Sequence, residues 1–218
     1  MSEFDTESKF YKFAKGRGVM NLPNKLTIAR VLMLPLFIVF FYVQFKGHYF
    51  AALAVFALAS FTDFLDGYFA RKYHLITNLG KFLDPVADKI LVAAAMIVFL
   101  TAPKVFFTLG LGGWSLIAGG CCVAVILGRE LIVSGFRMVA ADAGIVIAAD
   151  KIGKYKTVTQ MVSLIVLLVA AGLSEFLGSH LAVLILNYIG LGFFALATLL
   201  TVISGVNYIV KNIQVLKV

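Results

Sequence analysis

Charged residues are scarce in this sequence. Only 14% of its 218 residues are Asp, Glu, Lys or Arg, whereas 61% are hydrophobic, and the mean hydropathy is +0.99. A soluble domain carries about 25% charged and about 45–50% apolar residues. The scarcity of charge therefore excludes a soluble globular domain, a disordered chain and a nucleic-acid-binding module.

Cysteine is also scarce, because Cys121 and Cys122 are the only two and they are neighbours within an apolar run. Adjacent cysteines rarely bridge each other, so the sequence excludes a disulfide scaffold. We interpret both as small packing residues.

Long apolar runs are what the sequence has in abundance. A membrane-spanning helix needs ~20 predominantly apolar residues, and the chain has room for six. The sequence therefore predicts an all-α integral membrane bundle of six transmembrane helices in one domain, 20–218. Residues 1–19 form a polar N-terminal extension, cytoplasmic or juxtamembrane. The six apolar blocks lie near 27–45, 49–72, 81–101, 114–138, 155–173 and 181–210.

The positive charges divide unevenly between the two sides of this predicted bundle. Fifteen of the 19 Lys and Arg residues lie in the N-terminal segment through Arg30, the 71–81 and 137–156 connections and the C-terminus. The opposite connections contain only Lys46 and Lys104. Basic residues collect in cytoplasmic loops, so the sequence predicts a multi-pass protein of the cell membrane with both termini in the cytoplasm.

Four aspartates lie in or against the apolar helices around the second connection: Asp63, Asp66, Asp84 and Asp88. A carboxylate in a membrane helix costs several kcal/mol unless it is paired or hydrated, so such residues usually have a function. The predicted topology places all four near the cytoplasmic surface. Arg129 and Glu130 of the fourth helix lie at a similar depth, which indicates a hydrated cavity open to the cytosol and the inner leaflet.

Helical spacing groups these aspartates with small residues. At 100° per residue, one stripe covers an arc of ~140° and the other ~80°. The first stripe contains Asp63, Asp66, Gly67, Ala70 and Arg71, and the second contains Gly80, Asp84 and Asp88. The glycines let a bulky ligand approach the backbone, although close helix packing is the alternative reading.

Two facing stripes would bring four carboxylates together. Four anions cannot share a low-dielectric pocket without cations. Oxygen ligands favour hard ions, so the sequence predicts Mg²⁺, with Mn²⁺ as the alternative. Four carboxylates suit a site of two ions that clamps a phosphoryl group.

The residues from Asp63 to Asp88 read D-x2-D-G-x2-A-R-x8-G-x3-D-x3-D. This pattern resembles the motif of the CDP-alcohol phosphatidyltransferases. The resemblance implies a six-helix, metal-dependent membrane enzyme that transfers a phosphatidyl group from CDP-diacylglycerol to an alcohol and releases CMP. It also implies a homodimer.

The segments around this motif resemble one branch of that family, the bacterial phosphatidylglycerophosphate synthases. They include residues 21–30, Arg129-Glu130, the run 134–137 and the run 153–157 with Gln160. The acceptor implied by this resemblance is sn-glycerol 3-phosphate.

Matching positions in the family motif implies a role for each residue. Asp63, Asp66 and Asp84 hold metal, and Asp88 is the general base for the acceptor hydroxyl and also touches metal. An alcohol that attacks phosphorus must lose its proton, which makes a base chemically sensible here. The residues implied to border the cytidine nucleotide are Gly67, Ala70, Arg71 and Gly80, with Asn24 and Thr27 as further contacts.

An acceptor that carries a phosphate needs cations away from the metal site. The candidates on the cytoplasmic side are Arg129, Arg137, Lys154 and Lys156. Topology alone also explains the two lysines, and a buried pair with a carboxylate also explains Arg129. Adjacent residues do not face each other on a helix, so we expect Glu130 to pair elsewhere.

Other functions remain open from the sequence. Within the same chemistry, the acceptor could be inositol, inositol phosphate, serine or a second phosphatidylglycerol. A divalent-metal transporter would also use intramembrane carboxylates, but it should show an inverted repeat and polar residues that continue to the outer side. A purely structural bundle has no need of four acids at these spacings.

Overall fold

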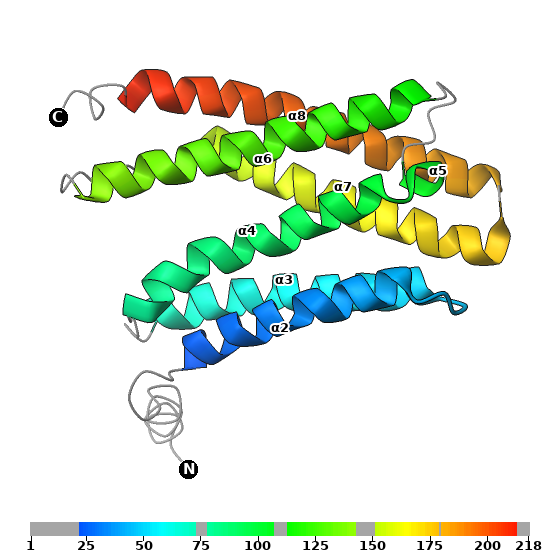
Figure 1. The fold of residues 1–218 in the computed structure, drawn as a ribbon, viewed down its shortest axis with the longest axis horizontal. Helices are drawn as coiled ribbons and strands as arrows, with labels where there is room; N and C mark the ends of the chain where they lie inside the picture. The colour runs from blue at the N-terminus through cyan, green and yellow to red at the C-terminus, as the bar shows by residue number, and fades with distance from the viewer. Residues whose placement is uncertain (1–21, 73–77, 107–112, 143–150, 179, 213–218) are drawn as a thin grey trace, which may run out of the picture. The chain divides into compact units, whose positions relative to one another are not determined.

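The computed structural model describes residues 22–72, 78–106, 113–142, 151–178 and 180–212. The predicted extension 1–19 lies outside these residues. Side chains are not described at 22–24, 64, 66–72, 78–86, 88, 104, 141–142 and 151. Within the described ranges every regular element is a helix: α2 (Leu22–Tyr42), α3 (His48–Lys72), α4 (Asn78–Leu100), α5 (Pro103–Phe106), α6 (Gly113–Asp142), α7 (Lys151–Leu177) and α8 (Leu181–Asn212) (Figure 1).

The six long helices coincide with the six apolar blocks, so the prediction of an all-α chain is confirmed. Four helices are long and apolar enough to cross a membrane: Lys25–Tyr42, Gly113–Ala140, Ile152–Leu177 and Leu181–Asn212. The apolar parts found in α3 and α4 are shorter, His48–Asp63 and Lys89–Leu100. Both helices become polar where the predicted site begins, because the aspartates occupy the end of α3 and the start of α4.

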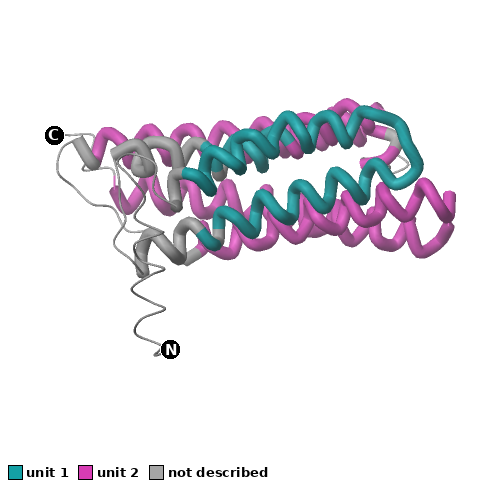
Figure 2. The backbone as a smooth tube through the Cα atoms, turned by 90° about the horizontal axis from the view of Figure 1, so that it is seen from below, with its two compact units in different colours: residues 1–94 teal, residues 95–218 magenta. Residues whose placement is uncertain are grey.

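The chain divides into two compact units, residues 1–94 and 95–218 (Figure 2). In the first unit α2 packs against α3 as an antiparallel pair, joined by a turn in which Gly47 has a φ of 93°. That conformation favours glycine because it lacks a Cβ atom. The rings of Phe37 and Phe56 meet with centroids 6.0 Å apart, and both side chains are fully buried.

In the second unit α7 packs closely on α8. Gly178, at a φ of 61°, ends α7 in the left-handed conformation that is common after a helix. Gly190 lets α8 approach, since a Cβ atom there would lie 2.8 Å from Cγ of Leu167. Ser163 on α7 donates a hydrogen bond to the carbonyl of Gly190 at 2.8 Å. This close contact fixes α7, which carries Lys154 and Lys156, against α8.

Helix α6 lies along α8 and runs in the same direction (Figure 1). Val133, Phe136 and Ala140 of α6 form a buried cluster with Tyr208 of α8. Large apolar side chains project from these helices: Trp114, Leu131, Met138 and Leu181 are each about 70% exposed. Soluble proteins rarely expose such large apolar side chains in continuous patches, so these positions suit contact with lipid.

Candidate active site

The acidic end of the first unit is formed where α3 ends and α4 begins. Asp63 and Asp66 lie on the last turns of α3, and Asp84 and Asp88 lie on the first turns of α4. The connection between these helices is five residues long, 73–77, so the two pairs belong to neighbouring helix ends. Among the four aspartates, only the side chain of Asp63 is described.

Arg30 of α2 reaches Asp63 across the helix pair. Its Nη1 lies 2.8 Å from Oδ1 of Asp63, and its Nε donates a 3.4 Å hydrogen bond to the carbonyl of Ala59. The Arg30 side chain is only 1% exposed, whereas the Asp63 side chain is 48% exposed. One carboxylate oxygen therefore faces a buried cation while the carboxylate as a whole stays accessible to solvent.

This arrangement is compatible with a hard metal ion at the acidic end. The donor set is entirely carboxylate oxygen, which is the ligand type that Mg²⁺ prefers. The 2.8 Å ion pair with Arg30 restricts the orientation of Asp63, and partners outside the metal site commonly orient metal-binding carboxylates in this way. No group of three metal-binding side chains occurs among the described residues, of which Asp63 is the only member of the predicted set.

The predicted nucleotide contacts belong to the same unit. Thr27 is fully buried on α2, one turn before Arg30 and on the same face of the helix. The side chains of the other five lie outside the described residues: Asn24, Gly67, Ala70, Arg71 and Gly80.

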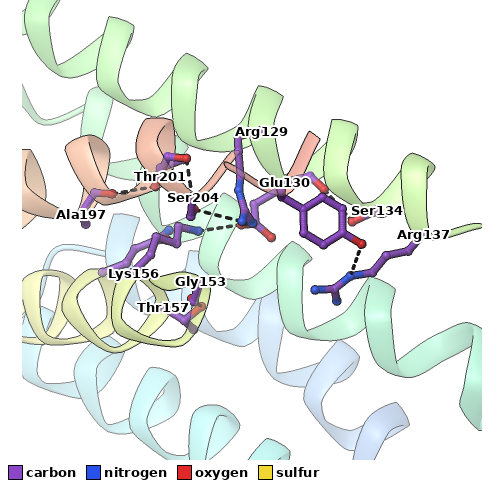
Figure 3. A network of polar contacts seen from close by, with 12 residues as sticks. Arg129, Glu130, Ser134, Arg137, Gly153, Lys156, Thr157, Ala197, Thr201 and Ser204 are labelled. Carbon is purple, nitrogen blue, oxygen red and sulfur yellow. Dashed lines mark hydrogen bonds and ion pairs between the residues drawn. The ribbon is translucent and has the colours of Figure 1, made fainter. Parts of the chain in front are cut away.

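A second group of charged residues is centred on Glu130 in the other unit (Figure 3). Lys156 Nζ of α7 donates a 2.7 Å hydrogen bond to Oε1 of Glu130, and Arg129 Nη1 donates a 3.1 Å bond to the same oxygen. Arg129 Nη2 also donates a 3.0 Å bond to Ser204 Oγ on α8. We call Arg129, Glu130, Lys156 and Ser204 the Glu130 cluster.

Two glycines make room for the Arg129 side chain. A Cβ atom at Gly205 of α8 would lie 3.0 Å from Cγ of Arg129, and one at Gly153 of α7 would lie 3.7 Å from its Nη2. The guanidinium therefore lies close to the backbones of both neighbouring helices. The cluster is well shielded, since the side chains of Lys156, Arg129 and Glu130 are 4%, 14% and 22% exposed.

Arg137 and Lys154 are more accessible than the cations of the Glu130 cluster, and both are exposed. Nε of Arg137 donates a 3.3 Å hydrogen bond to the hydroxyl of Tyr208, and its guanidinium carbon lies 5.6 Å from the centre of that ring. Phe136 packs edge-on against the same ring, with centroids 6.0 Å apart. The Tyr208 side chain thus connects Arg137 to the buried contact of α6 with α8.

The structure tests the expected pairing of Glu130. The partner on another helix is Lys156, as expected. The contact with Arg129 agrees with the alternative reading of that arginine as a pair with a carboxylate, although adjacent positions diverge on a helix. It forms because the long arginine side chain can turn back toward its neighbour, and Ser204 holds the other end of the guanidinium.

Sequence reasoning missed the partners of two residues. Arg30 was counted only as a cytoplasmic charge, although an arginine one turn after Thr27 in an apolar helix already indicates a buried partner. The sequence places Glu130 at the depth of the aspartates and predicts a partner other than Arg129, but it does not identify that partner. Cys121 and Cys122 are both free, as expected.

Comparison with known proteins matches most of the chain to one family. Residues 20–203 match the family model for CDP-alcohol phosphatidyltransferase. A CDP-diacylglycerol–glycerol-3-phosphate 3-phosphatidyltransferase of Bacillus subtilis is 37% identical over 211 residues, which cover 91% of this chain and 98% of the relative. The protein of that name from Rickettsia typhi is 36% identical, covering 86% of this chain and 94% of the relative.

A third relative carries a different name. A cardiolipin synthase (CMP-forming) of Oryza sativa is 41% identical over 154 residues, which cover 69% of this chain and 46% of the relative. The family model covers most of the chain and includes the whole aspartate motif as well as Glu130 and Lys156. The protein is therefore a multi-pass membrane protein that belongs to the CDP-alcohol phosphatidyltransferase family.

Proposed function

We propose that this protein transfers the phosphatidyl group of CDP-diacylglycerol to sn-glycerol 3-phosphate, which yields phosphatidylglycerophosphate and CMP. The observation that carries the proposal is the likeness to transferases of that name along nearly their whole length, 98% for the Bacillus subtilis protein. The acidic end suits a metal-bound diphosphate, and the exposed cations of the other unit suit an acceptor with its own phosphate.

We infer that Asp63, Asp66, Asp84 and Asp88 hold Mg²⁺, with Mn²⁺ as the alternative and two ions as the expected number. The bound ion would neutralise the diphosphate and stabilise CMP as it leaves. Asp88 accepts the proton of the acceptor hydroxyl, so that the oxygen can attack phosphorus. The residues proposed to border the nucleotide are Gly67, Ala70, Arg71, Gly80, Asn24 and Thr27.

The acceptor phosphate is proposed to bind at the four cations named from the sequence, Arg129, Arg137, Lys154 and Lys156. Arg137 and Lys154 are exposed and can make direct charge-assisted hydrogen bonds. Arg129 contributes from the Glu130 cluster, where its guanidinium is held by Glu130 and Ser204. Lys156 is almost fully buried against Glu130, so its contribution to phosphate binding passes through that carboxylate.

We further propose that all six long helices cross the cell membrane, with both termini and the active site on the cytoplasmic side, and that the enzyme is a homodimer. The uneven distribution of basic residues supports this orientation. A cysteine at Lys154 should resist an impermeant reagent in intact cells, in a background lacking Cys121 and Cys122. Ready labelling from outside would contradict the orientation.

The proposed reaction is tested by CMP release from CDP-diacylglycerol with a panel of acceptors. We expect glycerol 3-phosphate to support release, and inositol, inositol phosphate and serine to fail. Phosphatidylglycerol belongs in the panel because the Oryza sativa relative is named a cardiolipin synthase. If phosphatidylglycerol replaces glycerol 3-phosphate, the acceptor is wrong while the transferase chemistry survives. Absence of CMP release with every acceptor would reject the transferase itself.

A further inference from the structure

We propose that Glu130 is a positioning residue for the acceptor phosphate: it holds Arg129 and Lys156 together so that Arg129 is presented in one fixed orientation. This inference rests on the proposed function and extends it to a carboxylate that the proposed binding of metal, nucleotide and phosphate leaves without a role.

The first argument is geometric. Lys156 Nζ and Arg129 Nη1 approach the same oxygen, Oε1 of Glu130, at 2.7 and 3.1 Å (Figure 3). They come from different helices, α7 and α6, so the carboxylate ties together two elements of the unit. Ser204 of α8 accepts a bond from the other terminal nitrogen of Arg129. The guanidinium is thus anchored at both terminal nitrogens, which fixes its plane.

The second argument concerns charge. We call the charged members of the Glu130 cluster the trio: Arg129, Glu130 and Lys156. With one carboxylate and two cations, the trio has a net charge of +1. Apolar side chains of similar volume often replace a buried ion pair or triad without loss of stability, so stability alone is a weak reason for these three charges. A surplus positive charge is instead what a phosphate anion requires. Glu130 lowers the repulsion between the two cations and still leaves this surplus.

The third argument separates Lys156 from the exposed cations. The Lys156 side chain is 4% exposed and lies 2.7 Å from Glu130, whereas Lys154, two residues earlier, is exposed. Positions two apart point to different sides of a helix. Lys154 can therefore meet a phosphate from the cytosol directly, while Lys156 acts through the carboxylate that it supports.

The test uses the full-length enzyme in lipid nanodiscs and four variants: Glu130→Gln, Glu130→Asp, Lys156→Met and the double variant of Glu130→Gln with Lys156→Met. The KM for glycerol 3-phosphate, the KM for CDP-diacylglycerol and kcat are measured for each. Thermal unfolding with and without glycerol 3-phosphate reports acceptor binding without turnover. The matched control is Glu175→Gln, which makes the same change ~28 Å along α7 from Lys156.

Loss of the carboxylate should appear in the acceptor kinetics. We expect Glu130→Gln to raise the KM for glycerol 3-phosphate about tenfold, which corresponds to one charged hydrogen bond of about 1.5 kcal/mol. The KM for CDP-diacylglycerol should stay within about twofold, because the change should affect only acceptor binding. A general disturbance of the site would raise both KM values. Glu130→Asp should recover part of the loss, and Glu175→Gln should match the parent.

The double variant protects the test against simple misfolding. It retains Arg129 and the net charge of +1 while removing the buried lysine whose ion pair Glu130→Gln would break. Because both changes break one contact, its loss should be no greater than that of Glu130→Gln alone. We also expect glycerol 3-phosphate to raise the unfolding temperature of the parent and to raise that of Glu130→Gln less.

Three results would overturn the inference: a parental acceptor KM in Glu130→Gln, equal increases in both KM values, or losses that multiply in the double variant. A parent that is neither stabilised by glycerol 3-phosphate nor active with it would instead reject the proposed acceptor. The parent and the variants therefore report the two failures separately.

Discussion

The two charged regions of the molecule are both built around a contact between charged residues on different helices. Among the described side chains of the acidic end, Arg30 on α2 is paired with Asp63 on α3. In the Glu130 cluster a single carboxylate lies between two cations. In both places a charged residue reaches across to another helix and holds a residue of opposite charge.

The regions differ in which partner is accessible. Arg30 is buried and leaves Asp63 about half exposed, so the Asp63 carboxylate stays open to a ligand. Glu130 and both of its cations are largely shielded, and the accessible cations Arg137 and Lys154 lie outside the trio. We expect residues of the acidic end to act directly in chemistry. We expect Glu130 and Lys156 to act by orienting Arg129.

The largest effect should come from Asp63→Asn at the acidic end. Metal ions supply several kcal/mol of charge stabilisation in such reactions, so loss of one ligand should reduce CMP release at least about a hundredfold. EDTA should abolish the activity of the parent, and added Mg²⁺ should restore it. CMP release and metal titration measure both effects.

Thr62→Val is the matched control for this substitution. Thr62 is adjacent to Asp63, but its hydroxyl bonds only to the carbonyl of Ala59 on the same helix, at 2.7 Å. We expect it to retain parental activity. Full activity of Asp63→Asn, or of the parent in EDTA, would show that the acidic end does not act directly in the chemistry. The proposed difference in role between the two regions would then be wrong.

The second-largest effect should come from replacing the exposed cations Arg137 and Lys154. Arg137→Ala and Lys154→Ala should each lower acceptor efficiency by roughly tenfold to a hundredfold, the loss of a charged hydrogen bond of about 1.5–3 kcal/mol. The requirement for CDP-diacylglycerol should change little. Steady-state kinetics with each substrate varied in turn separates the two.

Two controls accompany this pair. Lys211→Ala removes an exposed lysine from the last turn of α8 and should have no effect on acceptor kinetics. Tyr208→Phe removes only the hydroxyl that accepts the 3.3 Å bond from Arg137, so its loss should be smaller than that of Arg137→Ala. If both alanine variants match the parent, the phosphate does not bind at these cations.

A smaller effect should follow from Arg30→Lys, which keeps the charge but loses the second hydrogen-bond donor. We expect it to lower the free energy of unfolding by about 1–2 kcal/mol, at the low end of values for buried ion pairs because Asp63 is half exposed. Asp63→Asn breaks the same 2.8 Å contact, so the double variant should lose less than both single losses together. Thermal unfolding measures this coupling, and strictly additive losses would show that the contact does not stabilise the protein.

Much of the fold could be predicted from sequence because the membrane imposes helices on apolar runs. All six long helices lie where the apolar blocks do, and the prediction of free cysteines is confirmed. The paired charges could be predicted only in part. That Arg30 meets Asp63, 33 positions later, depends on how α2 packs on α3, and periodicity within one helix carries no such information.

The roles of the cations were harder to separate than their positions. Arg129, Arg137, Lys154 and Lys156 look equivalent in the sequence because all four lie near the same predicted surface. Packing separates them: Gly153 and Gly205 leave space for Arg129, and the α7 helix turns Lys156 inward and Lys154 outward. The two glycines carry no charge, so a search for binding residues does not select them.

The smallest expected effect tests whether the position of Arg129 matters in the way that the comparison implies. In Gly205→Ala the new methyl group would lie 3.0 Å from Cγ of Arg129, so the side chain must shift by a few tenths of an ångström. Gly192→Ala on the same helix meets nothing within 4 Å and is the matched control. Alanine favours the helix over glycine by about 1 kcal/mol, so neither variant should be strongly destabilised.

We therefore expect the two variants to differ in acceptor kinetics more than in unfolding. A shifted guanidinium weakens its bonds to Glu130 and Ser204, and the KM for glycerol 3-phosphate should rise about twofold to fivefold in Gly205→Ala, equivalent to ~0.4–1 kcal/mol. Gly192→Ala should keep the parental KM. Equal KM values in both variants would show that acceptor binding tolerates a displaced Arg129, and accessibility alone would then separate the roles of the charges in the two regions.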